Sequence, residues 1–409
     1  MYAAKPPLPG SVPWRLALLA VLCGLICLPF LSTAQAAAPA DETTGALSPV
    51  LCLPGVYLED PQDCLPVGPS EYLTRLGRLG ISFPQRPLPA ESPSASLAVL
   101  PYYYLRLKAG EATPVYSTLE AAIAESSPAL WIEAGDMRYL SYAEAISTNN
   151  QPKPNYFQLR SGGWIAAKSV SQRENAVIRY QGLTFSETPS HAFGWVIPLN
   201  PYVETKRTPG YSVQDATGRR IPEYGLVEVF DTQTVNDTEW YLVGPDEWLP
   251  GSTVGLVHPN PTPPEGVTNG RWIEINLYEQ TLAVYDQAQL VFATLVATGA
   301  EPYYTRPGTF TIYKRLEATP MRGAFEADRS DFYYLEDVPY TMYYDQARAL
   351  HAAYWRTRFG FAQSHGCVNL SPGDARWLYE WAQEGDAVYV WDPSGETPTD
   401  PAYYGEGGA

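Results

Sequence analysis

The sequence contains little cysteine, and its cysteines are unevenly placed. Four of the five lie within the first 64 residues, and the fifth, Cys367, stands alone near the other end. No Cys-x-x-Cys pair occurs that would indicate a zinc site of the paired-cysteine type. Histidine is equally scarce, with four in 409 residues, yet His351 and His365 both lie within sixteen residues of Cys367.

Positive charge is also scarce. The 27 Lys and Arg residues against 44 Asp and Glu give a formal net charge of −17. A protein of this sign is poorly suited to bind nucleic acid. The balance favours a soluble protein that works outside the cell, without a nucleic-acid partner.

Long hydrophobic runs are nearly absent. The one long apolar stretch, 16–31, is preceded by basic residues and followed by an Ala-x-Ala sequence at 34–36. It is shorter than the ~20 residues that a membrane-spanning helix needs. Residues 1–36 are therefore predicted to be a signal peptide that is removed on export. An uncleaved membrane anchor is the alternative.

Loss of the leader leaves three cysteines. In an oxidising compartment Cys52 and Cys64 can close a small loop, which leaves Cys367 as the odd cysteine. An odd cysteine in an exported protein indicates intermolecular pairing or a reactive thiol. The alternatives are an inert buried cysteine, or a metal site of His351, His365 and Cys367 that lacks a fourth ligand at the usual spacing.

A mainly β fold is predicted from residue 99 onward, where short aromatic and β-branched runs alternate with turn residues. Residues 37–98 form a Pro-rich tether with one short apolar helix over 70–81. The length of the chain predicts two to four domains.

Two stretches, 99–175 and 176–258, resemble the small Src-homology-like β-barrel modules of cell-envelope proteins. Each contains a tryptophan followed by an aliphatic residue at a strand end, Trp164 in the first and Trp248 in the second. These tryptophans form either the core of a barrel or part of a ligand groove.

A Pro/Gly/Asn-rich linker, 259–270, precedes a further β-rich domain over 271–392. Its opening residues alternate apolar and polar over two strands joined by a turn near 286–287. One helix is predicted after Cys367, with Ser371 as N-cap, Pro372 in the first turn and Asp374 as capping-box acid. The last strand is "DAVYVW", and 393–409 is a flexible tail.

The residues around Cys367 suit nucleophilic chemistry. A thiol attacks an acyl carbon as the thiolate, so it needs a base or a positive field nearby. His351 can supply the base if the intervening segment folds back as a loop. In an extended segment His365 shares a face with Cys367, and Gly366 permits close approach and offers N–H groups to an oxyanion.

The sequence "SHGCVN" at 364–369, with His351 sixteen residues before Cys367, resembles the active site of the L,D-transpeptidase (YkuD-type) family. "TRPGTFTIYKR" resembles that family's Thr-x-Pro-Gly-x-Phe element, and the likeness covers about 271–392. Two positions depart from the family. Ala352 stands where glycine is frequent, and Arg356 where histidine is frequent.

The resemblance implies roles for individual residues. Cys367 is the nucleophile, His351 is the base, and the main-chain carbonyl of Ala352 holds the other imidazole nitrogen. The backbone N–H groups of Gly366 and Cys367, supported by His365, are candidates for the oxyanion hole. The remaining candidates order the loop or line a substrate cleft: Ser364, Asn369, Met342, Tyr344, Tyr354 and Trp355.

The implied reaction is the formation of 3→3 cross-links in peptidoglycan. The thiolate attacks the third residue of a tetrapeptide stem and expels D-alanine, and an amine of a neighbouring stem takes the acyl group. Water as acceptor gives an L,D-carboxypeptidase, and a protein amine gives protein-to-wall anchoring. A non-catalytic wall-binding protein and a cysteine peptidase of another fold are further readings.

The expected partners follow from the same resemblance. They are peptidoglycan stem peptides, wall glycan through the barrel-like modules, and carbapenem-type β-lactams as inhibitors. No metal or organic cofactor is required.

Overall fold

The computed structural model describes residues 69–82, 84–148, 150–173, 178, 180–197, 201–329 and 331–404. The predicted signal peptide and the Cys52–Cys64 loop lie outside these residues. Helix α1 (Pro69–Arg78) confirms the short helix expected in the tether, and it belongs to a unit separate from residues 87–404. Arg75 and Arg78 lie in its last turn, where a positive charge is favourable to the helix dipole. None of the described helices is long and apolar enough to cross a membrane.

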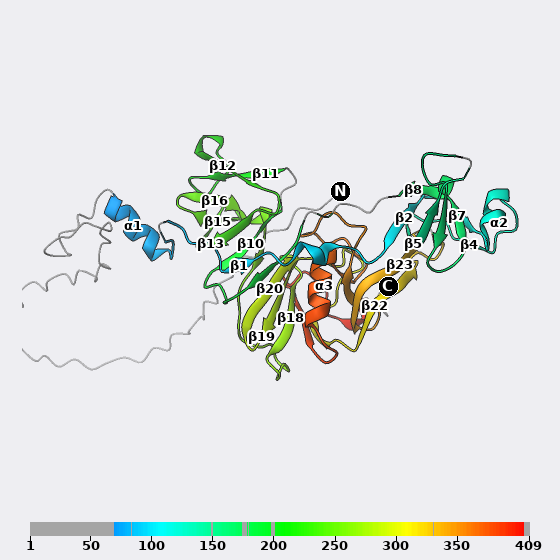
Figure 1. The fold of residues 1–409 in the computed structure, drawn as a ribbon. Helices are drawn as coiled ribbons and strands as arrows, with labels where there is room; N and C mark the ends of the chain where they lie inside the picture. Colours follow the sequence, from blue (N-terminus) through cyan, green and yellow to red (C-terminus); the bar gives the residue numbers. More distant parts are fainter. Residues whose placement is uncertain are drawn as a thin grey trace, which may run out of the picture. The chain divides into compact units, whose positions relative to one another are not determined.

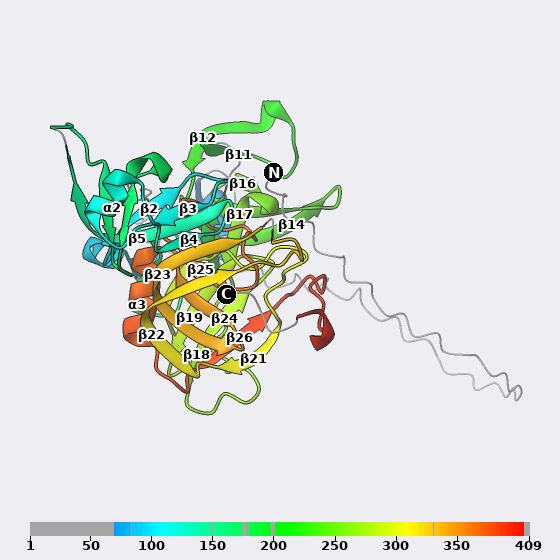
Figure 2. The ribbon, with the colours of Figure 1, turned by 90° about the vertical axis from the view of Figure 1, so that its right-hand side faces the viewer.

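The first sheet of the larger unit has seven strands, and its central strands come from the segment after the linker (Figure 1). In order across the sheet they are β1 (Ala90–Glu91), β9 (Leu183–Phe185), β20 (Gln289–Leu295), β19 (Thr281–Asp286), β18 (Arg271–Asn276), β26 (Ala387–Trp391) and β21 (Gly308–Thr311). Strands β18 and β26 run parallel. Figure 2 shows β18, β19, β26 and β21 side by side.

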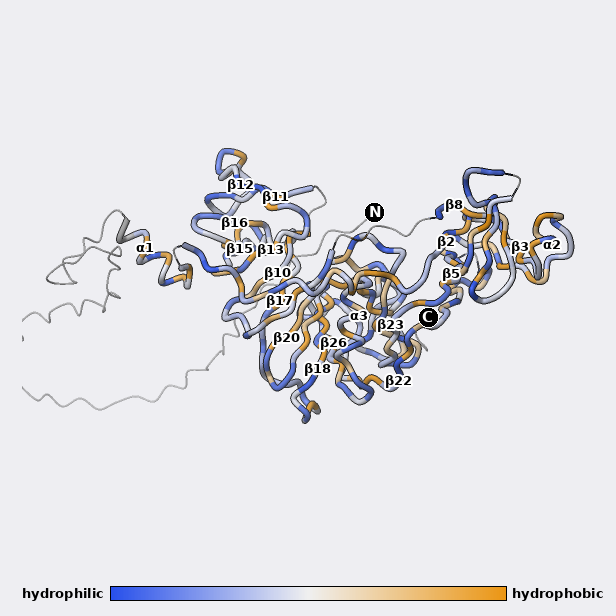
Figure 3. Tube along the Cα trace, viewed as in Figure 1, coloured by the Kyte–Doolittle hydropathy of each residue, from blue (hydrophilic) through white to orange (hydrophobic). Residues whose placement is uncertain are grey.

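The hairpin expected at 286–287 is confirmed. Gln287 and Ala288 connect β19 to β20 with φ of 48° and 63°. Positive φ at two consecutive turn residues fits the right-handed twist of the strands that the turn joins. Figure 3 shows hydrophobic and hydrophilic stretches alternating along this part of the chain.

The second sheet joins the segment around Cys367 to strands from far upstream. Its order is β25 (Val368–Leu370), β24 (Arg348–Ala352), β23 (Tyr333–Asp345), β5 (Met137–Ile146), β2 (Tyr103–Leu107) and β8 (Val170–Gln172). Off this path, β22 (Lys314–Gly323) pairs with β23, β6 (Tyr156–Leu159) pairs with β5, and β7 (Trp164–Ala166) pairs with β6.

The remaining strands form smaller sheets. One has the order β13 (Leu226–Val229), β10 (Ala192–Val196), β17 (Val254–Val257), and another has β12 (Ala216–Pro222), β11 (Tyr202–Lys206), β16 (Glu247–Pro250), β15 (Thr238–Gly244), β14 (Asp231–Val235). A two-stranded pair consists of β3 (Thr113–Val115) and β4 (Leu130–Ile132). The other helical turns are α2 (Leu119–Ala124), η2 (Ala95–Ala98), η3 (Ala167–Ser169), η4 (Val213–Asp215), η5 (Gly251–Thr253) and η6 (Pro401–Tyr403).

The mainly β prediction is confirmed, but the prediction of two barrels is not. Among the described strands, those of 99–175 and 176–258 form open sheets, and no barrel closes. Two of these strands instead pair with the segment after the linker: Tyr333 of β23 pairs with Met137 of β5, and Phe292 of β20 pairs with Thr184 of β9. In a barrel, the edges of β5 and β9 would pair with other strands of the same barrel. Here these edges are covered by strands of the two large sheets.

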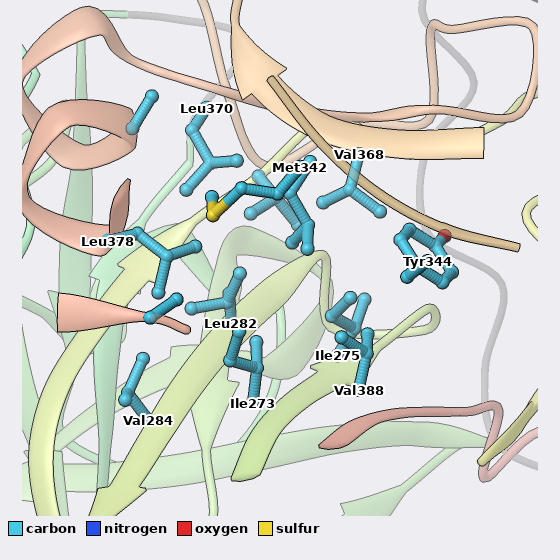
Figure 4. Close-up of a cluster of buried hydrophobic side chains, with 14 of the residues drawn as sticks. Ile273, Ile275, Leu282, Val284, Met342, Tyr344, Val368, Leu370, Leu378 and Val388 are labelled. Carbon is cyan, nitrogen blue, oxygen red and sulfur yellow. The ribbon is translucent and has the colours of Figure 1, made fainter. Parts of the chain in front are cut away.

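The main core lies between the two large sheets and helix α3 (Pro372–Trp381). Alternate residues of β18, Ile273 and Ile275, face this core, while Trp272 faces the other way and stacks on Tyr285. Figure 4 shows side chains from both sheets and α3 meeting in this cluster, including Ile273, Ile275, Leu282, Val284, Met342, Tyr344, Val368, Leu370, Leu378 and Val388.

Helix α3 begins as predicted. Ser371 is the N-cap and its Oγ accepts from Asp374 N at 3.3 Å, with Pro372 in the first turn. Asp374 also makes hydrogen bonds outside the helix. Its carboxylate accepts from Gly182 N at 2.8 Å and from Thr294 Oγ1 at 2.6 Å. Burial raises its pKa to about 6. Asp374 thus joins α3 to β20 and to the segment before β9.

Strand β23 is held to the upstream strands by a buried carboxylate. Glu336 is 4% exposed and accepts from Ser141 N at 2.9 Å and from Ser161 Oγ at 2.6 Å. Its neighbour Asp337 accepts from Ser141 Oγ at 2.6 Å and from Arg160 Nε at 3.1 Å. These bonds join residues almost 200 positions apart in sequence.

We expect Glu336→Ala to lower the free energy of unfolding by about 1–3 kcal/mol, because it leaves a buried Ser141 N–H without an acceptor. The measurement is urea denaturation followed by fluorescence. Glu317→Ala, at an exposed position of the adjacent strand β22, is the control and should stay within about 0.5 kcal/mol of the parent protein. Equal losses in the two variants would contradict the assignment.

Candidate active site

Two short parallel strands bring the candidate residues together. Strand β24 pairs with β25 in a register that places Leu350 opposite Val368 and His351 opposite Asn369. Cys367 comes directly before β25, on the same face as Asn369 in an extended chain. The segment between the strands therefore folds back, which is the condition for His351 to act as the base, and His351 lies on the strand adjacent to Cys367.

The imidazole of His351 is fixed on both sides. Its Nδ1 lies 3.1 Å from the Ala352 carbonyl oxygen, and its Nε2 lies 3.1 Å from Asn369 Nδ2. The Ala352 carbonyl can only accept, so the imidazole proton is assigned to Nδ1, which donates to it. The Asn369 NH₂ group can only donate, so Nε2 is the acceptor. His351 is 2% exposed, and burial lowers its pKa to about 4. At neutral pH it is an uncharged base.

Asn369 is itself oriented by Arg356. The guanidinium Nε donates to Asn369 Oδ1, while Nη1 donates to Gln363 Oε1 at 3.1 Å and Nη2 to the Gln363 carbonyl at 2.7 Å. An amide whose oxygen faces a cation must present its NH₂ group elsewhere, here to His351. Arg356 also contributes to lowering the pKa of His351, after burial.

Cys367 is a buried, protonated thiol. It is 5% exposed, and its Sγ lies 3.8 Å from the Ala347 carbonyl. Burial raises its pKa to about 11, while the backbone N–H of Ala349 and the charge of Arg348 act in the opposite direction. Both partners of the expected pair, thiol and imidazole, are therefore neutral at rest.

The loop of 364–367 is held by short-range hydrogen bonds. Ser364 Oγ donates to the Cys367 carbonyl at 2.5 Å and accepts from Gly366 N at 3.2 Å. Thr305 Oγ1 donates to the Gly366 carbonyl at 2.8 Å, and Gly366 has a φ of +119° that favours glycine. Ser364 therefore makes hydrogen bonds within the loop, and its loop-ordering role stays a prediction. The Gly366 N–H, however, reaches an oxyanion only if it gives up Ser364.

His365 lies in an aromatic group. Its ring stacks on Phe325 at 4.5 Å and lies 4.8 Å from the ring of Tyr303, with Tyr333 at 6.3 Å. Burial lowers its pKa, and the Asp331 carboxylate acts in the opposite direction. His365 itself lies two residues before Cys367 in the sequence.

The four cleft candidates are placed differently. Met342 and Tyr344 are buried in the main core, 0% and 3% exposed, with Tyr344 packed against Phe310 at 5.5 Å. Tyr354 is also buried, and its OH donates to the Glu336 carbonyl at 2.9 Å. Only Trp355 is half-buried, with its ring 5.7 Å from that of His351.

Residues from the upstream segment also surround Cys367, and sequence reasoning did not include them. Tyr104 belongs to the buried cluster that contains Cys367, and Tyr139 packs against this cluster. Tyr104 stacks on Tyr354 with ring centroids 3.6 Å apart. Nothing local in the sequence indicated this contact, which depends on the pairing of β5 with β23.

A metal site is not observed in the described part of the chain. No group of three or more His, Cys, Asp or Glu residues there is arranged to hold a metal ion.

Comparisons with known proteins show which family these residues resemble. Residues 270–390 match the family model of the L,D-transpeptidase catalytic domain, YkuD. This match confirms, over these residues, the family resemblance that the sequence indicated. A comparison with curated proteins gives no match.

Solved structures of L,D-transpeptidases are similar to this chain. A cysteine-to-serine mutant from Enterococcus faecium is 23% identical over 30% of this chain and 49% of its own, with a TM-score of 0.28. The enzyme from Stackebrandtia nassauensis is 28% identical over 32% of this chain and 57% of its own, with a TM-score of 0.25. The match thus spans about half the length of these two proteins.

A third similar structure is the E. faecium catalytic domain acylated by ertapenem. It is 24% identical over 30% of this chain and 96% of its own, with a TM-score of 0.27.

The depressed pKa of His351 predicts a loss of stability in acid. The unfolded imidazole protonates near pH 6.5 and the folded one only near pH 4, so the unfolded state binds more protons between these values. Stability contributed by neutral His351 is complete above pH 6.5 and lost as the pH falls towards 4, by up to roughly 3 kcal/mol.

Urea denaturation at pH 7 and pH 4.5 measures this loss. His351→Gln removes the titrating group, so its stability should fall less between the two pH values than that of the parent protein. The same pH dependence in both proteins would contradict the assignment.

Proposed function

We propose that the segment matching the family model transfers acyl groups between peptidoglycan stem peptides, through a thioester on Cys367. The observation that carries this proposal is the fixed imidazole of His351. With its Nδ1–H on the Ala352 carbonyl, its Nε2 is the nitrogen available as a base, on the strand adjacent to the thiol.

The first half-reaction forms the thioester. His351 Nε2 takes the proton of Cys367 as Sγ attacks the carbonyl carbon of the third stem residue. The tetrahedral intermediate collapses, its bond to the D-alanine nitrogen breaks, and His351 returns the proton to this leaving amine. Because Asn369 Nδ2 donates to Nε2 at rest, this hydrogen bond is exchanged when the base accepts the proton.

The second half-reaction consumes the thioester. An amine of a neighbouring stem attacks the acyl carbon, His351 Nε2 takes its proton, and the sulfur leaves and is reprotonated. The product is a 3→3 cross-link. Water in place of the amine gives a carboxypeptidase, and a protein amine gives anchoring to the wall.

The uncharged resting state gives substrate binding a role in activation. A neutral thiol with a pKa of about 11 beside an imidazole with a pKa of about 4 transfers its proton only when the anionic sulfur or oxyanion is stabilised. The enzyme therefore couples formation of the nucleophile to occupation of the site.

The same reaction defines the location and the inhibitors that we propose. Stem peptides lie outside the cytoplasm, which agrees with the export signal predicted at residues 1–36. The ertapenem adduct of the E. faecium catalytic domain supports a carbapenem as a reagent for Cys367. Wall glycan remains a proposed ligand of the upstream sheets.

Purified protein should release D-alanine from defined tetrapeptide stems and form cross-linked dimers, detected by mass spectrometry. Cys367→Ala should reduce both products at least 1,000-fold, by analogy with loss of other covalent nucleophiles. Ertapenem should add its mass to the peptide that contains Cys367 in the parent protein only.

The products distinguish the alternatives. Release of D-alanine without dimers would replace the transpeptidase by a carboxypeptidase. Ser394→Ala, in a turn after the last strand of the domain, is the control and should keep full activity. Full activity of Cys367→Ala would overturn the proposal.

A further inference from the structure

A cluster of buried charge lies beneath the loop that carries Cys367. Arg348 Nη1 donates to Asp345 Oδ2 at 3.0 Å, and Arg306 Nε donates to the same oxygen at 2.9 Å. The side chains of Arg348 and Asp345 are each 3% exposed, and that of Arg306 is 27% exposed. Two guanidinium groups thus share one carboxylate, and the cluster has a net charge of +1.

Arg348 is placed against the backbone of the loop. Its Nη2 donates to the Tyr404 carbonyl, but its Nε is buried without a hydrogen-bond partner. A Cβ built on Gly366 would lie 3.3 Å from this Nε and 3.6 Å from the Tyr304 carbonyl oxygen. The guanidinium is therefore packed directly under Gly366, the residue before Cys367.

An unpaired buried donor and an unbalanced buried charge are both costly. A protein retains such groups at a site where an anion forms during the reaction. The anion then offsets the energetic cost of the buried positive charge and of the unpaired donor. The nearest group that gains a negative charge during the proposed reaction is the sulfur of Cys367, or the oxyanion that forms next to it.

The other groups around Cys367 do not supply this charge. Tyr333, Tyr343 and Tyr344 of β23 interact electrostatically with the thiol, but they are neutral phenols, and burial raises their pKa values. His351 is neutral at pH 7, and His365 interacts with Asp331 among aromatic rings. Arg348 is the charged side chain that lowers the pKa of the thiol.

We infer that Arg348 sets the electric field at Cys367 and stabilises its anionic sulfur, and that Asp345 limits the strength of this field. Arg348 does not touch the substrate in this role, so it acts through the sulfur. The inference deepens the proposed function, on which it rests for the use of the thiolate. The property itself belongs to the free protein and needs no substrate.

Arg348 also has a structural contact, since it holds Tyr404 near the chain end, and this contact must be separated from its charge. Loss of the structural contact and loss of the charge are expected to shift the thiol pKa of Cys367 in opposite directions. Loosening the site exposes the thiol and moves its pKa down from about 11 towards the ordinary value near 8.5. Loss of a stabilising positive charge moves the pKa up.

The experiment is the pH dependence of iodoacetamide alkylation at Cys367, followed by mass spectrometry of the peptide that contains it. Arg348→Gln should raise the thiol pKa by roughly one unit and slow alkylation about tenfold at pH 8. Arg348→Lys keeps the charge and should stay close to the parent value. Asp345→Asn raises the net charge of the cluster and should lower the pKa.

Arg315→Gln is the matched control. Arg315 also has a buried Nε without a hydrogen-bond partner and also donates to a main-chain carbonyl, that of Tyr379, but it lies on β22 beside α3. Its loss should leave the thiol pKa unchanged. A lowered or unchanged thiol pKa in Arg348→Gln would overturn the inference, whether or not the protein forms cross-links. Absence of cross-links with the expected pKa changes would overturn only the proposed function.

Discussion

The candidate chemistry depends on the parallel pairing of β24 with β25. A one-residue shift of this register would turn His351 and Asn369 to opposite faces and separate the imidazole from the strand that Cys367 precedes. The pairing is fixed by the core beneath it, because Leu350, Val368 and Leu370 on the other face are fully buried against β18, β26 and α3. Hydrophobic packing thus determines the geometry of a polar site.

Burial also determines the charge state of that site. Taking the thiol and the imidazole out of water favours the neutral form of each, which keeps the free protein from carrying a permanent thiolate. In a compartment that oxidises sulfur, a buried thiol of raised pKa is protected from the reactions that require thiolate. The odd cysteine count that remains after the predicted loss of the leader is therefore compatible with export.

Sequence patterns predicted the elements whose signals are local. The hairpin at Gln287 and Ala288 and the N-cap at Ser371 each depend on a few neighbouring residues. The contact of His351 with the Ala352 carbonyl was instead expected from the family resemblance. The two barrels are not confirmed, because a period-2 pattern shows that a segment is a strand but not which strand edge it pairs with. Met342 and Tyr344 are residue types that are common in substrate clefts. Only the position of the second sheet shows that their side chains face the core.

The long-range contacts could not be read in this way. Arg356 stood out in the sequence as a departure from a family pattern, but its hold on Asn369 depends on how the intervening loop folds. Arg348 carried no signal, since an arginine in a strand is usually exposed and its burial beneath Gly366 depends on Asp345 and on the chain end.

The surroundings of Cys367 extend beyond the residues that match the family model. Residues 270–390 contain Cys367 and His351, but the apolar surroundings of the sulfur include Tyr104 from β2, which stacks on Tyr354 beside Trp355. Within the second sheet, Glu336 of β23 accepts a hydrogen bond from Ser141 of the upstream strand β5. Because β23 also pairs with β24, a displacement of the upstream strands acts on the strand that carries His351. The upstream segment is therefore part of the buried surroundings of Cys367, and its sequence shapes the candidate site.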